Sequence, residues 1–173
     1  MNARRRLIDA ATMIPENVAP RRGEHMKVAE LNSMIRRALN NLIKNETFLL
    51  DNDASEWSIS HRLAIYIEQE IPGWNVDCEY NRQGKGKEPK TNRTKDNVRP
   101  DIVLHHRGRA SCDHNMLVIE VKKNRIDKDA GKACEYTCAP RGGRKYQYQY
   151  GLALSVIGEP QLRWFSNGKE IEP

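Results

Sequence analysis

The chain has 173 residues, of which 38% are hydrophobic, 6% aromatic and 30% charged, and its formal net charge is +6. This length suits one domain, or one domain with an extension, whose small core lies under a heavily charged surface. No stretch approaches the roughly 20 apolar residues of a membrane span, and the N-terminus lacks a signal peptide, which leaves a basic protein whose charge favours nucleic acid as its partner.

The first 50 residues are predicted to form an N-terminal arm followed by an amphipathic helix. Residues 1–26 carry Pro15, Pro20 and basic pairs and are predicted to be irregular. From residue 28 to 44, apolar side chains recur at helical spacing. The remaining residues, 51–173, are assigned to the second unit.

A second helix is predicted to begin near Asp53 and to end at Pro72-Gly73. Asp53 is the expected N-cap, with Glu56 three residues later as its reciprocal partner. Glu56 also lies at the head of the apolar stripe that should face a sheet. It is therefore either a simple capping glutamate or an acid that faces a functional site, and the two roles are compatible.

Three strands are expected next, at residues 74–80, 101–106 and 115–122. Between the first two strands, residues 83–97 form a basic segment without a large apolar side chain, which predicts a mobile loop. It is either a solvated insertion or a loop that embraces a phosphate backbone.

The last third of the chain predicts a short helix within residues 127–145 and a buried strand at the end of residues 146–156. Residues 162–168 predict one final strand with a turn at Asn167-Gly168.

Charged residues on a core strand are the most informative feature of the sequence. In "LVIEVKK", the alternation of a strand places Glu120 and Lys122 on one face beside Val118. Burying such charges is costly unless they pair or hold a metal. If residues 101–106 and 115–122 form an antiparallel hairpin, Asp101 lies close to Glu120. Two carboxylates with a main-chain carbonyl and waters suit Mg²⁺ or Mn²⁺. For a Pro-Asp pair taken alone, a turn leading into the strand is the simpler interpretation.

These residues resemble a known superfamily. Pro100-Asp101, followed after eighteen residues by Glu120-Val121-Lys122, resembles the motif of the PD-(D/E)xK nucleases, which share the restriction-endonuclease-like fold. The similarity spans residues 53–157 and extends to a group of uncharacterised prokaryotic proteins without a known substrate. It implies an α/β fold: a restriction-endonuclease-like core with a mixed central sheet, an antiparallel catalytic hairpin, flanking helices and an N-terminal helical extension.

The resemblance also implies residue roles. Asp101 and Glu120 would be metal ligands, Glu56 a further acid from the helix, and Lys122 the lysine that orients water or stabilises the phosphate. Basic residues would bind the nucleic-acid backbone without reading its sequence. They are Arg62, Arg82, Lys85, Lys87, Arg99 and Lys123, of which Arg62 could instead pair with an acid. His105 shares the Asp101 face, where a structural hydrogen bond is the simplest role.

The expected activity is metal-dependent hydrolysis of phosphodiester bonds by an endonuclease, with DNA favoured over RNA and a homodimer left open. Two alternatives are a catalytically silent nucleic-acid-binding module and a structural partner in a larger complex.

The four cysteines contain no CxxC pair, which fits reduced thiols in the cytoplasm. A zinc site from Cys112, His114, Cys134 and Cys138 is conceivable, but these spacings match no common zinc module. The simpler interpretation is thiols without a role in chemistry.

Overall fold

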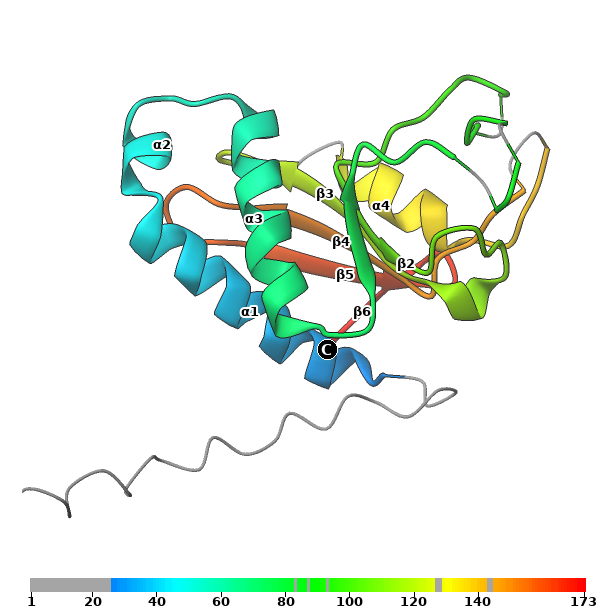
Figure 1. Ribbon diagram of the computed structural model, residues 1–173, viewed down its shortest axis with the longest axis horizontal. Coiled ribbons are helices and arrows are strands. Elements are labelled where there is room, and N and C mark those ends of the chain that lie inside the picture. The colour runs from blue at the N-terminus through cyan, green and yellow to red at the C-terminus, as the bar shows by residue number, and fades with distance from the viewer. Residues whose placement is uncertain (1–25, 83, 87, 93, 127–128, 143–144) are drawn as a thin grey trace, which may run out of the picture.

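The computed structural model describes residues 26–82, 84–86, 88–92, 94–126, 129–142 and 145–173. It is an α/β structure in which a six-stranded mixed sheet has helices on both faces (Figure 1). The strands lie in the order β1-β2-β3-β4-β5-β6, and β3 and β4 form the one parallel pair of this sheet. No helix among the described residues is long and apolar enough to span a membrane. The elements are α1 Val28–Asn45, α2 Thr47–Asp51, α3 Glu56–Glu70, β1 Asn75–Cys78, β2 Ile102–His105, the 3-10 helix η1 Cys112–His114, β3 Asn115–Lys122, α4 Asp129–Thr137, β4 Tyr150–Ser155, β5 Leu162–Ser166 and β6 Lys169–Ile171.

Helices α1 and α3 pack together on one face of the sheet. The buried side of α1 carries Leu31, Ile35 and Leu42, which share one apolar core with Leu63 of α3 and Ile119 of β3. Their spacing confirms the amphipathic helix expected from the sequence. Because α1 contributes to the main core, it is an integral layer of the domain, and a boundary at residue 51 separates no second core.

Helix α3 begins two residues later than expected. Ser55 is its N-cap, and the Ser55 hydroxyl accepts a hydrogen bond of 3.2 Å from the Ser58 backbone N–H. The expected capping role of Asp53 is therefore wrong. Asp53 has a left-handed backbone with φ of 54°, and its carboxylate instead accepts a 2.6 Å bond from Lys123 Nζ. This contact ties the entrance of α3 to the end of β3.

Strands β2 and β3 form the antiparallel hairpin that the sequence predicts. Ile102 pairs with Ile119, and the register shifts between Leu104 and His105. Alternation sends Ile102 and Ile119 into the core under α1 and α3, whereas Val103 belongs to a second cluster on the opposite face. The catalytic candidates Asp101, Glu120 and Lys122 are an even number of residues from Val103 or Val118, so strand alternation places them on this second face.

Helix α4 connects the parallel strands and covers the second face. Its backbone lies so close to β4 that a side chain at Gly151 would collide with the Ala133 carbonyl. The expected short helix and buried strand are thus confirmed as α4 and β4. The final segment differs from expectation, because a turn at Asn167-Gly168 joins two strands, β5 and β6, where one was predicted.

The segment between β1 and β2 is anchored by a buried lysine. Lys90 is 2% exposed, and its ammonium donates to the Tyr80 carbonyl at 3.0 Å and to the Tyr148 hydroxyl at 2.6 Å. It also lies 4.8 to 5.8 Å from the ring centres of Tyr80, Tyr146 and Tyr148. Lys90 therefore belongs neither to a fully solvated insertion nor to a surface that could contact a phosphate backbone, which were the two roles expected of residues 83–97.

Candidate active site

Asp101 lies directly before β2 and opposite β3. Ile102 pairs with Ile119 across the hairpin. One more residue in the same antiparallel register places Asp101 opposite Glu120. Asp101 Oδ2 accepts a 2.7 Å hydrogen bond from the Val121 backbone N–H. Burial raises the pKa of Asp101, although the Val121 bond and the charges of Lys122 and Lys132 oppose this shift. The Asp101 carboxylate is therefore held in place by a backbone hydrogen bond and has limited access to water.

Glu120 lies in the middle of the core strand β3, where its side chain is only 5% exposed. Alternation directs it to the α4 face, and Lys132 Nζ of α4 approaches Glu120 Oε2 at 3.8 Å. Burial raises the pKa of Tyr136 on the same helix, and the charges of Glu120 and Asp101 raise it further. A carboxylate in such a position is expensive to keep unless other groups compensate its charge.

Lys122 and Glu56 bring the end of β3 against the first turn of α3. Lys122 Nζ donates to Glu56 Oε2 at 2.8 Å, and the Lys123 backbone N–H donates to Glu56 Oε1 at 3.3 Å. The N-terminus of a helix also favours an acidic side chain. The Lys122 side chain is 28% exposed, and its positive charge lies close enough to Asp101 to lower the pKa of that carboxyl against the effect of burial.

Of the three acids expected to bind a metal, Asp101 lies directly before β2 and Glu120 lies on β3, whereas Glu56 lies on α3. Asp101 and Glu120 are neighbours, and Glu56 acts electrostatically on Asp101. Among the described residues, however, no group of three or more His, Cys, Asp or Glu side chains is arranged to hold a metal ion. In the structure Glu56 forms an ion pair with Lys122, and its expected role as a further metal ligand stays a prediction. Two carboxylates still fit a hard cation that keeps several waters, as Mg²⁺ does.

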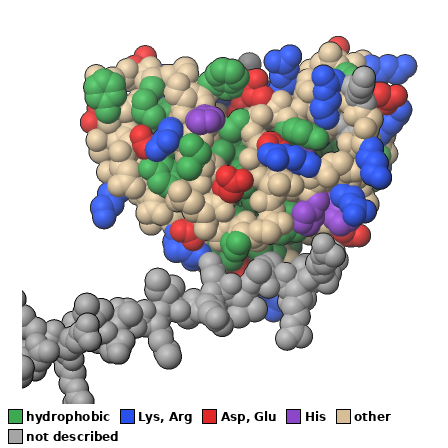
Figure 2. Space-filling view, in the orientation of Figure 1, with side chains coloured by type: hydrophobic (Ala, Val, Ile, Leu, Met, Phe, Trp, Pro, Cys, Tyr) green, Lys and Arg blue, Asp and Glu red, His purple; other side chains and the backbone are tan. Residues whose placement is uncertain are grey.

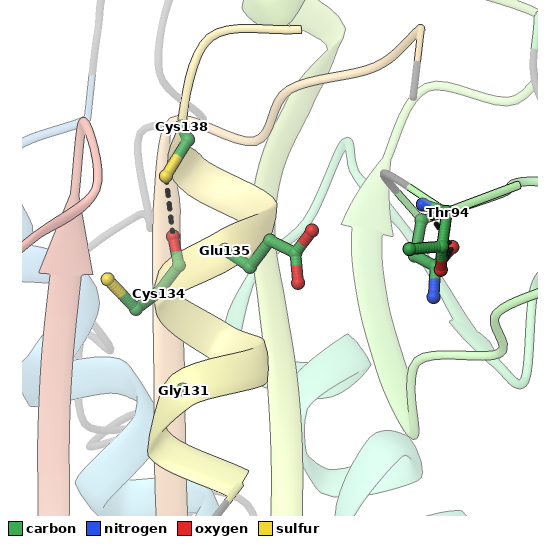
Figure 3. Close-up of a pocket in the computed structure, with 6 residues that line it drawn as sticks. Thr94, Gly131, Cys134, Glu135 and Cys138 are labelled. Carbon is green, nitrogen blue, oxygen red and sulfur yellow. Dashed lines mark hydrogen bonds between the residues drawn. The ribbon is translucent and has the colours of Figure 1, made fainter. Parts of the chain in front are cut away.

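The alternative zinc site is not assembled. Cys134 lies on α4 and Cys138 directly follows it, and both line a cavity of about 460 Å³ together with Asn92, Thr94, Gly131 and Glu135 (Figure 3). Cys112 and His114 belong to η1, and all four cysteines are free thiols. This cavity lies between α4 and the 92–94 segment, and neither Asp101 nor Glu120 lines it.

The basic residues expected to bind nucleic acid differ in their surroundings. Arg62 pairs with Glu46, which matches the acidic partner left open by the sequence, and Lys123 pairs with Asp53. Arg99 Nη1 lies 3.8 Å from Glu79 and its side chain is 63% exposed. Arg82 and Lys85 are exposed, whereas Lys87 lies outside the described residues. Figure 2 shows Lys and Arg side chains concentrated along the right-hand side of the visible face.

His105 has the structural role that the sequence favoured. Its Nε2 lies 2.8 Å from Asp77 Oδ2, and Arg107 Nε donates to the same oxygen at 2.8 Å. Burial lowers the pKa of His105, although the bond to Asp77 opposes the shift. Neither this network nor Lys132 could be predicted from the sequence, because strand and helix periodicity do not reveal which distant elements pack together.

Comparison with models of known protein families, with curated proteins and with solved structures gave no match.

Proposed function

We propose that the protein is a Mg²⁺- or Mn²⁺-dependent nuclease that hydrolyses phosphodiester bonds, with DNA as the favoured substrate and endonucleolytic cleavage as the favoured mode. The observation that carries the proposal is the position of Asp101, which directly precedes β2 and accepts a hydrogen bond from the Val121 backbone N–H, next to the 5% exposed Glu120 of β3. The resemblance of this hairpin to the PD-(D/E)xK motif supports the same activity.

A cation is the natural partner of this pair of acids. Burial already raises the pKa of Asp101, and the nearby charge of Glu56 raises it further. Glu120 is buried and Asp101 is half-buried, so a divalent cation between the two carboxylates would lower the cost of keeping them charged and would satisfy their oxygens. When bound, Mg²⁺ or Mn²⁺ would supply a Lewis acid for water and for the phosphate.

The other charged residues have distinct roles in this proposal. Lys122 provides positive charge where negative charge develops on the phosphate. Glu56 is a positioning residue, because its carboxylate holds the Lys122 ammonium at 2.8 Å. The exposed residues Arg82, Lys85 and Arg99 would contact the nucleic-acid backbone. A cytoplasmic setting would keep the four thiols reduced.

A catalytically silent nucleic-acid-binding module is the second candidate. It is favoured by the internal partners of the charged residues: Glu56 pairs with Lys122, and Lys132 approaches Glu120. In that case the charges would serve the structure and no cation would be required.

Cleavage of a substrate panel separates the two candidates. Supercoiled plasmid, single-stranded circular DNA and structured RNA are incubated with the full chain in Mg²⁺, Mn²⁺, Ca²⁺ or EDTA. The nuclease proposal predicts cleavage of at least one substrate in Mg²⁺ or Mn²⁺ and none in EDTA. Binding of nucleic acid without cleavage in any metal would favour the silent module.

A further inference from the structure

Trp57 is exposed directly beside the candidate active site. It follows Glu56 in the first turn of α3, and 63% of its surface is open to solvent. The other two tryptophans are placed differently: Trp164 is 1% exposed and donates to Asn32 at 3.2 Å, and Trp74 stacks on His106 with ring centres 4.1 Å apart. Leaving an indole in water forgoes the stabilisation that its burial would give.

The fold explains why Trp57 contributes little to the core. An α-helix turns about 100° per residue, so Trp57 lies about a quarter turn round from Glu56. The buried stripe of α3 runs through Ile59, Leu63 and Ile67 on the side of Glu56. The indole is therefore presented at the rim of the site, next to the acid that holds Lys122.

Positive charge lies beside the same helical turn. The Lys122 ammonium and the Lys123 backbone N–H both bond to Glu56, and Lys123 Nζ bonds to the Asp53 carboxylate at 2.6 Å. These contacts bring the basic end of β3 against the first turn of α3. Lys122 and Lys123 are each paired with an acid, yet their ammonium groups lie beside the turn that carries the exposed ring. A flat aromatic face next to ammonium groups complements a nucleic-acid strand, which combines an anionic backbone with flat bases.

We propose that Trp57 is a stacking platform for an unpaired base of the substrate, next to the bond that is cleaved. This inference rests on the proposed nuclease function and narrows its substrate class to single-stranded or locally unpaired nucleic acid. Inside a duplex both faces of a base are covered by its neighbours, whereas a base in a single strand can stack on an indole. Stacking tolerates every base, so the contact brings affinity without sequence preference.

The test measures oligonucleotide binding without metal, in a Glu120→Gln background that prevents cleavage. Tryptophan fluorescence is recorded while a 12-residue single-stranded oligonucleotide is added, and affinity is measured by anisotropy with single-stranded and duplex probes. Trp57→Ala should weaken single-strand binding by about 5- to 150-fold and leave duplex binding nearly unchanged. Trp57→Phe should abolish most of the fluorescence quenching but retain most of the affinity.

Trp74→Phe is the matched control. Trp74 follows the C-terminal end of the 15-residue helix α3, roughly 20 Å from its first turn at 1.5 Å per residue. Its replacement should preserve both the affinity and the quenching that single-stranded oligonucleotide causes.

The possible failures are distinguishable. If the wild-type chain binds single strands but Trp57→Ala binds them equally well, the stacking inference is overturned and the nuclease proposal is unaffected. If the Trp57 variants change the sedimentation of the free protein and not its oligonucleotide affinity, the indole belongs to a protein contact and the inference is again overturned. If the wild-type chain binds neither probe and cleaves no substrate, the proposed function itself fails.

Discussion

Replacing Lys90 with methionine should remove a rise in stability between neutral and alkaline pH. Lys90 is buried among Tyr80, Tyr146 and Tyr148, and burial lowers its pKa from 10.5 to about 7. Between these two values the unfolded chain binds a proton that the folded chain does not. The free energy of unfolding must therefore increase as pH rises from about 7 to 10.5. Below about pH 7 both states are protonated, and the full cost of the buried charge remains.

The magnitude follows from the size of this shift. A single group contributes at most about 1.36 kcal/mol per pH unit, so the gain between pH 7.5 and 9.5 cannot exceed about 2.7 kcal/mol. The three tyrosine rings and the 2.6 Å bond to Tyr148 favour the charged lysine and reduce this gain. We expect a gain of about 1 to 2.5 kcal/mol in the wild type, absent from Lys90→Met.

Urea unfolding at pH 7.5, 8.5 and 9.5 measures this difference. The comparison uses the change with pH because methionine leaves the Tyr80 carbonyl and the Tyr148 hydroxyl without their donor, which lowers stability at every pH. Lys85→Met, at an exposed position, is the matched control and should retain the wild-type pH dependence. Equal pH dependence in the wild type and Lys90→Met would refute the reasoning.

Three further predictions concern the site and the layer that supports it. Asp101→Asn should abolish binding of Mn²⁺ and leave the metal-free protein equally or more stable at pH 7. Because burial raises the pKa of Asp101, the stability of the wild type relative to Asp101→Asn should fall as pH rises from 3.8 through the raised value, as urea unfolding of both proteins at pH 4 and 7 will show. Lys122→Ala should lower single-turnover cleavage by about 10²- to 10⁴-fold with little change in substrate affinity, and because its ion pair is partly exposed, unfolding free energy should fall by less than about 1 kcal/mol. Gly151→Ala should destabilise the fold by about 3 kcal/mol in thermal melts, because the new methyl group would meet the Ala133 carbonyl, whereas Gly131→Ala meets no atom and should not.

Local patterns in the sequence were sufficient for the elements that carry the site. The apolar period of residues 28–44 predicted α1, and the alternation around Glu120 predicted a buried strand with a charge on its second face. The short connection between residues 106 and 115 favoured the antiparallel hairpin, which placed Asp101 beside Glu120. These predictions succeeded because helical period, strand alternation and hairpin register are set by residues that are close together in the sequence.

The contacts of the charged side chains could not be predicted in the same way. Lys122 meets Glu56 across 66 positions of sequence, and Lys90 meets Tyr148 across 58. Nothing in the composition of residues 83–97 distinguishes the buried Lys90 from the exposed Lys85. The cap of α3 was misassigned because Asp53 and Ser55 are both good N-cap residues, and the pull of Lys123 on Asp53 arises only in the folded chain.

The central claim is that Asp101 and Glu120 form a metal-dependent hydrolytic site. The most direct measurement is single-turnover cleavage of labelled DNA in saturating Mn²⁺ by the wild type, Asp101→Asn and Glu120→Gln, with Asp113→Asn as an exposed acidic control. The account predicts loss of cleavage in both site variants, with folding retained, and wild-type cleavage in the control. Cleavage at the wild-type rate by folded Asp101→Asn or Glu120→Gln would contradict it.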